Sequence, residues 1–191
     1  FSETVGGRYS LWGPVSIGVR MVHGNPVFNE LLEGAALMDG HVLQSKASQC
    51  IPTLLALSDL YNLEHGAASL MLSPYDSRLG QLVPYLQQLW MESLGKGVNN
   101  QGELLDKPAC PILWGDVGTN GQHAFFQMLH QSKIASSVEL IAVVQPDHDE
   151  VKSHQVLLSH ALAQSEAFSV GRLNSPEELS NTATNFRKVF M

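Results

Sequence analysis

Positive charge, cysteine and long apolar runs are all scarce in this chain, and each shortage excludes a class of function. The sequence has 11 Lys and Arg against 18 Asp and Glu, with no block of basic residues. Nucleic-acid binding draws on concentrated positive charge, so nucleic acid is excluded as the main partner. Cys50 and Cys110 form neither a CxxC pair nor a zinc-binding pattern, which favours reduced thiols and a cytoplasmic location.

Membrane segments are equally absent from the sequence pattern. The longest apolar runs, such as residues 51–57 and 140–144, are far too short to span a bilayer. The first residues show no basic-then-apolar leader pattern, so we expect no membrane association. With 44% hydrophobic and 15% charged residues, a chain of 191 residues has the composition of an ordinary globular domain with one sizeable core.

Common cofactor and metal motifs are missing as well. The chain has no GxGxxG, Walker loop, GxSxG or HExxH motif. The histidines other than His123 form no convincing set of metal ligands, and the acidic segment 147–150 is interpreted as an exposed loop. We therefore predict neither a cofactor nor a metal site.

Hydrophobic periodicity predicts an α/β fold with a parallel sheet flanked by helices. Short apolar runs bounded by Pro, Gly or Ser indicate buried strands, and 3.6-residue spacing indicates helices between them. The predicted strands are 68–72, 111–114 and 138–144; the predicted helices are 13–22, 26–38, 51–63, 77–94, 121–131, 151–170 and 176–190. We expect residues 1–66 to form a helical lead-in segment and residues 67–191 the α/β domain.

Polar residues accompany the apolar stripe of the predicted helix 77–94. Gln88 and Glu92 are four residues apart, so they share a face opposite that stripe. By itself this placement predicts a solvated surface glutamate without a function.

His123 follows a predicted buried strand and opens a predicted helix. Thr119 or Asn120 could serve as the N-cap, which would place the ring near the positive end of the helix dipole and favour its uncharged form. A neutral imidazole there could exchange protons with a substrate near neutral pH. The simpler alternative is a structural histidine.

Three separated segments carry a resemblance to a known family. Val5 to Trp12 reads VGGRYSLW, Gln87 to Lys96 reads QQLWMESLGK, and Trp114 to His123 reads WGDVGTNGQH. Together they resemble the glucose-6-phosphate isomerase family, and the similarity extends over nearly the whole chain. The resemblance implies a three-layer sugar isomerase-type fold that interconverts glucose 6-phosphate and fructose 6-phosphate through a cis-enediolate.

The resemblance also implies a role for each candidate residue. Glu92 would be the base that moves a proton between C1 and C2, and Gln88 would contact the substrate. His123 would open the sugar ring and would serve the active site of the neighbouring subunit, which implies a homodimer. Arg8 would stabilise the enediolate with a charge that does not titrate near neutral pH. Without the family match, Arg8 would instead be expected to cap a helix or to pair with a carboxylate.

Parts of the family pattern have no counterpart in this sequence. The Ser/Thr-rich phosphate-binding loops and a catalytic lysine of the family are not matched, and Asp116 and Val117 stand where many relatives have Glu and Pro. We therefore expect a fragment. Two functions remain open: the catalytic core portion of an isomerase, or a non-catalytic module of sugar isomerase type that binds a sugar phosphate or a protein partner.

Overall fold

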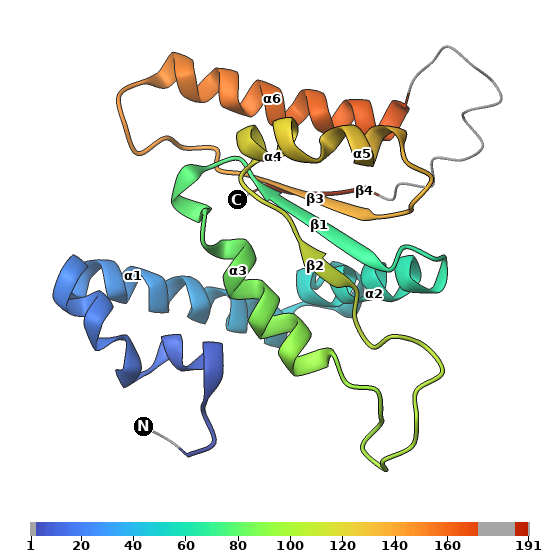
Figure 1. The fold of residues 1–191 in the computed structure, drawn as a ribbon. Coiled ribbons are helices and arrows are strands. Elements are labelled where there is room, and N and C mark those ends of the chain that lie inside the picture. The colour runs from blue at the N-terminus through green and yellow to red at the C-terminus, as the bar shows by residue number, and fades with distance from the viewer. Residues whose placement is uncertain (1–2, 172–185, 191) are drawn as a thin grey trace. The chain divides into compact units, whose positions relative to one another are not determined.

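The computed structural model describes residues 3–171 and the strand 186–190 (Figure 1). The chain divides into two compact units, Phe1–Ser58 and Asp59–Met191. Each unit is described by itself below. The first is made of helices, and the second contains a parallel sheet with helices on both faces.

The first unit begins with two short 3-10 helices, η1 Gly7–Trp12 and η2 Pro14–Ser16. They lead into the long helix α1, Ile17–Gln44, which bends at Gly24, where φ is 83°. The predicted helix 13–22 covers η2 and the first half of α1, and the predicted helix 26–38 lies in the second half, which continues to Gln44. Pro26 lies just beyond Gly24, in the first turn of the second half, where its missing N–H is least costly.

A histidine joins the end of α1 to the next helix. The short helix η3, Ala47–Gln49, precedes α2, Ile51–Glu64, which continues into the second unit. His41 Nδ1 lies 3.0 Å from the Ser45 hydroxyl, and its Nε2 accepts a hydrogen bond of 3.0 Å from the backbone N–H of Ile51. The ring thereby satisfies one of the orphan N–H groups at the start of α2.

Four parallel strands form the sheet in the order β2-β1-β3-β4. Their bounds are β1 Ser69–Pro74, β2 Ile112–Trp114, β3 Ser137–Ala142 and β4 Phe186–Phe190. In β1, one of the two inner strands, Leu70 is opposite Leu113 on one side and Ser137 on the other. The first three strands were predicted from the sequence, within two residues at each end.

The last strand overturns one prediction. Residues 176–190 were expected to form a helix; residues 176–185 lie outside the described residues, and Phe186–Phe190 is a strand. Its backbone pairs with β3 from Val138↔Phe186 to Ala142↔Phe190. Pairing with a strand far away in the sequence outweighs the local spacing that had favoured a helix.

Helices cover both faces of the sheet, so this unit has three layers (Figure 1). One face packs against α3, Leu82–Gln87, and the π-helical turn η5, Gln88–Glu92. The other packs against α5, Phe126–Gln131, and α6, Val151–Val170, with α4, Gly118–Ala124, leading into α5. Alternate strand residues point to the two cores: Leu70 and Leu72 to the first, Met71 and Val138 to the second.

Two helices that were predicted as continuous are interrupted. In place of one helix over 77–94, the chain forms η4, Ser77–Leu79, then α3 and then η5. Pro84 occupies the first turn of α3, where a helical N–H has no partner. The predicted helix 121–131 starts earlier, at Gly118, and breaks at Phe125, where φ is −141° and ψ −3°. The Phe125 ring instead packs edge-on against Trp114, with 4.9 Å between centroids.

Candidate functional site

The carboxyl ends of β1 and β2 meet at one edge of the sheet, and the chain after each strand is held there tightly. The Ser73 hydroxyl donates a 2.9 Å hydrogen bond to the carbonyl of Asp116, which joins β1 to the loop after β2. The Asp116 carboxylate accepts a 2.7 Å bond from the N–H of Val117, so it orders its own loop. Ligand sites of open parallel sheets lie at such carboxyl ends.

Gln88 and Glu92 are the first and last residues of η5. Between them, Trp90 and Met91 pack against the core of that face, so the turn is anchored on its inner side. Glu92 is exposed, and Gln88 is partly exposed. A π-turn is rare inside helices and is frequent at functional sites. Gln88 and Glu92 thus share one turn, as their four-residue spacing predicted, but this turn is π-helical and wider than an α-helical one.

Two neighbours of these residues tie η5 to the edge strand β2. The side-chain amide of Gln87 donates a 3.1 Å hydrogen bond to the Leu113 carbonyl. The Leu113 N–H in turn donates to the sulfur of Met91 over 3.4 Å. The side chains of Gln87 and Met91 thus bond both polar backbone groups of Leu113. Because these two side chains face the sheet, the side chains of Gln88 and Glu92 point away from it.

His123 lies elsewhere in its helix than the sequence indicated. The N-cap of α4 is Val117, without a side-chain cap, and neither Thr119 nor Asn120 holds that place. Because α4 ends at Ala124, His123 falls in its last turn, at the negative end of the helix dipole. The expected argument for a neutral ring from the helix N-terminus is therefore wrong. The side chain of His123 is exposed.

Tyr75 connects β1 to the helix that carries His123. Its hydroxyl accepts a 2.9 Å hydrogen bond from the side-chain amide of Gln122. The side chain is 1% exposed, and burial raises the pKa of this phenol to about 12 although the bond from Gln122 opposes the shift. The group therefore stays protonated throughout the neutral range.

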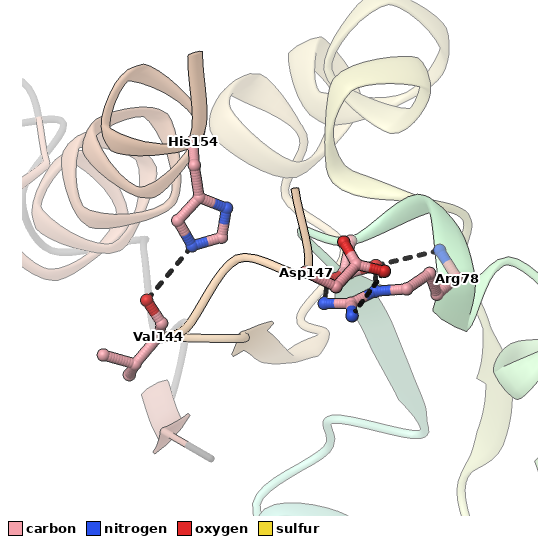
Figure 2. Close-up of polar contacts among 5 residues, drawn as sticks. Arg78, Val144, Asp147 and His154 are labelled. Atoms are coloured by element: carbon pink, nitrogen blue, oxygen red, sulfur yellow. Dashed lines mark hydrogen bonds and ion pairs between the residues drawn. The ribbon is translucent and has the colours of Figure 1, made fainter. Parts of the chain in front are cut away.

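An ion-pair clamp closes the turn after β1 and reaches the segment after β3 (Figure 2). Arg78 binds the Asp76 carboxylate through Nε at 2.9 Å and through a second guanidinium nitrogen at 2.5 Å. Its third nitrogen lies 2.9 Å from Asp147 Oδ2. The hydrogen bonds from Arg78 lower the pKa of Asp76 despite its burial, and Asp76 raises the pKa of Arg78.

A buried histidine supports the same segment. His154, on α6, is 5% exposed, and its Nε2 lies 3.1 Å from the carbonyl of Val144. Figure 2 shows this contact as a dashed line. The chain that carries Asp147 is thereby held at one point by Arg78 and at another by His154. Residues 147–150 are exposed and lie outside helices and strands, as the sequence predicted, but the ion pair between Asp147 and Arg78 was not predicted. The only local signal is the short Asp76-Ser77-Arg78 sequence, in which the carboxylate caps η4.

Arg8 belongs to the first unit, where it is the second residue of η1. Its side chain is exposed. Gly7 has φ 56°, so the tight backbone turn expected before Arg8 is present. The Ser10 hydroxyl donates a 2.8 Å hydrogen bond to the carbonyl of Gly7 and closes this turn.

Glu92 and His123 are carried by helices on opposite faces of the sheet. Trp90 and Met91, beside Glu92, pack against the core of one face, whereas Phe125 and Phe126, beside His123, pack against the other. Among the described residues, neither the Glu92 carboxylate nor the His123 ring takes part in a hydrogen bond or ion pair. The structure thus brings Gln88 and Glu92 together and keeps His123 separate from them.

The described residues contain neither a candidate membrane span nor a metal-binding group of side chains. No helix among these residues is long and apolar enough to cross a bilayer. Within the same residues, no three His, Cys, Asp or Glu side chains are grouped so that they could hold a metal ion.

The two curated relatives described here are both named glucose-6-phosphate isomerase. Glucose-6-phosphate isomerase of Rhizorhabdus wittichii is 47% identical over 177 residues, which cover 91% of this chain and 35% of the relative. The enzyme of the same name from Jannaschia sp. is 43% identical over 174 residues, or 90% of this chain and 32% of the relative. The chain therefore spans about a third of the length of the curated relatives that it matches.

Solved structures agree with the sheet and helix arrangement. A glucose-6-phosphate isomerase from Chlamydia trachomatis matches with a TM-score of 0.86 and 32% identity, over 100% of this chain and 39% of the other. A hypothetical protein from Thermus thermophilus matches with a TM-score of 0.74 at 22% identity, which supports the fold alone. The sequence model described as phosphoglucose isomerase matches residues 1–189. The chain is thus a member of the phosphoglucose isomerase family, with the parallel, helix-flanked sheet of the sugar isomerase-type fold.

Proposed function

We propose that this chain is the part of a glucose-6-phosphate isomerase that carries Arg8, Gln88, Glu92 and His123, and that the complete enzyme acts in glycolysis and gluconeogenesis in the cytoplasm. Family membership over residues 1–189 is the observation that carries the proposal. The family motifs surround each of these four residues. No metal or cofactor is needed, because the Glu92 carboxylate and the His123 imidazole supply the acid–base chemistry.

The proton transfer is assigned to Glu92. In the open-chain aldose, its carboxylate takes the proton from C2, and the electron pair forms the C1–C2 double bond of the enediolate. The Glu92 carboxyl then returns that proton to C1, and the proton of the C2 hydroxyl passes to the oxygen on C1, so that C1 carries the hydroxyl and C2 becomes the ketone. The exposed position at the end of η5 supports this role, because the base has to reach substrate carbon rather than a protein partner.

Arg8 and Gln88 are assigned to substrate binding. The guanidinium of Arg8 would balance the negative charge that develops on the enediolate oxygens, and it does so at any working pH. Gln88 shares η5 with Glu92, so its amide would bind a sugar hydroxyl beside the reacting carbons. Substitutions of Arg8 and of Gln88 test these two roles, through the affinity for fructose 6-phosphate and through the reaction rate.

His123 is assigned to ring opening, as the acid that protonates the ring oxygen. We propose further that it serves the site of a second copy in a homodimer. The position of Glu92 and His123 on opposite faces of one sheet supports this assignment, since a cyclic sugar has to touch both groups during its reaction. A two-fold dimer would place each histidine beside the partner's glutamate.

We also propose that residues 1–66 form the helical lead-in segment and that the α/β domain starts at residue 67. The end of α2 at Glu64 and the start of β1 at Ser69 bracket this boundary.

The first experiment is an assay of the 191-residue chain for conversion of fructose 6-phosphate to glucose 6-phosphate. Glu92→Gln should lower any activity by about 10² to 10⁴-fold, the usual contribution of a positioned base. Glu166→Gln changes an exposed glutamate on α6 and should leave the rate unchanged. Activity that survives Glu92→Gln would refute the assigned base. A chain that binds fructose 6-phosphate without turnover would instead be the non-catalytic module.

A mixing experiment tests the shared site. Glu92→Gln and His123→Gln chains are inactive alone under the proposal, but coexpression should restore about a quarter of the wild-type activity, because half of random dimers are mixed and each then has one intact site. The control pairs Glu92→Gln with the Glu92→Gln/His123→Gln double variant, which can form no intact site. Absence of recovery in mixed dimers would place both residues in the same subunit's site.

A further inference from the structure

Tyr75 is held unusually firmly for a residue that follows a strand. Its side chain is 1% exposed, and its N–H donates a 2.7 Å hydrogen bond to the Ile141 carbonyl, which extends the β1–β3 ladder by one residue. The ring belongs to the core that contains Met71, Val138 and Phe126. The Tyr75 side chain therefore has little conformational freedom. A group that contacts it is held in a fixed position relative to the sheet.

Two points on α4 contact this fixed ring. A Cβ atom added to Gly118 would lie 2.5 Å from Tyr75 ring carbons, so the first turn of α4 lies against the ring face at a distance that only glycine permits. One turn later, Gln122 donates its 2.9 Å hydrogen bond to the Tyr75 hydroxyl. Residues 118 and 122 are on the same side of a helix, so Tyr75 contacts α4 along one stripe.

The helix itself supplies little stability. It has only 7 residues, and Val117 at its N-cap makes no side-chain hydrogen bond. An isolated helix of this length is not stable in water. Its direction and rotation are therefore set by the contacts with Tyr75 at one end and by the packing of Phe125 and Phe126 at the other.

We propose that Tyr75, through its hydrogen bond to Gln122, is a positioning residue that sets the direction of the His123 side chain; its catalytic meaning rests on the proposed role of His123. His123 directly follows Gln122, so a rotation of α4 that releases Gln122 also turns the histidine. The phenol remains protonated over the neutral range, so the hydrogen bond to Gln122 does not change with pH there. Sequence motifs of the isomerase family did not single out Tyr75.

The test uses the 191-residue chain and the imidazole signals of His123 in NMR spectra, assigned by their loss in His123→Gln. Tyr75→Phe removes the hydroxyl and keeps the ring against Gly118. It should move the His123 ring signals and raise amide exchange in α4 by roughly threefold to tenfold, the equivalent of one lost hydrogen bond. Tyr61→Phe removes the hydroxyl of an exposed tyrosine and should change neither.

Gln122→Ala provides the second variant, since it leaves Tyr75 intact. It should move the His123 signals as Tyr75→Phe does, and the double variant should show no more than either single change. Additive effects, or His123 signals that stay in place in Tyr75→Phe, would overturn the positioning role. A merely structural contribution of the buried ring would lower stability without this shared, non-additive displacement.

Enzyme kinetics separate this inference from the proposed function. Where the chain is active, Tyr75→Phe should lower kcat about tenfold with KM unchanged, because substrate contacts are retained and ring opening is impaired. Where the chain is inactive, it is not an isomerase on its own, and the NMR comparison alone decides whether Tyr75 positions His123.

Discussion

A Cβ atom on Gly115 would lie 1.9 Å from the carbonyl oxygen of Leu72. Leu72 lies in the inner strand β1, and Gly115 is the first residue after β2. Its φ of 143° is also a conformation that residues with a side chain rarely adopt. The chain that leads from β2 to His123 is therefore pressed onto β1 at a point where any larger residue has to displace the strand.

Gly115→Ala should accordingly destabilise the fold by at least about 3 kcal/mol, through both the clash and the backbone conformation. Gly97→Ala is the matched control, since no atom lies within 4 Å of a Cβ at that position. Chemical denaturation of the two variants measures the difference. Equal unfolding midpoints would contradict the close approach of the loop to Leu72.

The Asp76–Arg78 pair should make stability depend on pH in the acid range. Because the folded-state pKa of Asp76 is lowered, chiefly by the hydrogen bonds from Arg78, its contribution is present above about pH 4, the ordinary range of the unfolded carboxyl, and is lost as the pH falls through the folded value. In Arg78→Met the guanidinium hydrogen bonds are lost while the backbone N–H of residue 78 still donates to Asp76, so the pKa of this carboxyl is lowered less. The variant should lose stability at neutral pH and change less on acidification.

Thermal unfolding between pH 3 and pH 7 checks this outcome for Arg78→Met. Lys107→Met is the control, because the Lys107–Glu64 pair is exposed on both sides at 67% and 61% and such pairs contribute little. A similar pH profile in both variants would argue against the clamp.

Gln87 and Gln88 should respond differently to the same substitution. Gln87→Leu leaves the Leu113 carbonyl without its side-chain donor and should cost about 1 kcal/mol of stability. Gln88→Leu should leave stability within about 0.5 kcal/mol and weaken the binding of fructose 6-phosphate. Denaturation and calorimetric titration of both variants separate the anchoring residue from the proposed substrate contact. A stability loss in Gln88→Leu together with weaker binding in Gln87→Leu would mean that Gln88 is the anchor and Gln87 the substrate contact.

Apolar side chains on α1 should promote self-association of the isolated chain. Met21, Leu37 and Leu43 are 80%, 75% and 85% exposed, and Val22 is 77% exposed. Exposed apolar surface of this kind marks association sites or aggregation. Leu37→Gln with Leu43→Gln should lower the apparent mass at high concentration in sedimentation velocity. Glu30→Gln, a polar change on the same helix, is the control, and equal masses for all chains would contradict the prediction.

Elements with a strong local pattern were predictable from the sequence, and elements defined by distant partners were not. Val151–Val170 forms the helix predicted over the same residues, because its apolar spacing is regular and it spans many turns. The strand Phe186–Phe190 was missed because pairing with β3 has no local signature. The break at Phe125 depends on a ring that packs against Trp114, which also cannot be seen in the spacing.

The candidate site shows the same division. The spacing of Gln88 and Glu92 indicated one shared turn, and the structure places them at the two ends of η5. The position of His123 was misjudged, because polar residues at 119 and 120 suggested an N-cap that the structure places at Val117. Tyr75 could not be identified, since its bond to Gln122 joins residues 47 apart in the sequence.

The inner position of β1 has a consequence for synthesis on the ribosome. Of the four described strands β1 is translated first, and it can pair with β3 only after the whole segment from Tyr75 to Ser136 has been translated. At roughly 5–20 residues per second, that delay lasts several seconds. During this interval a nascent strand containing Leu70, Met71 and Leu72 is open to chaperones or to other nascent chains.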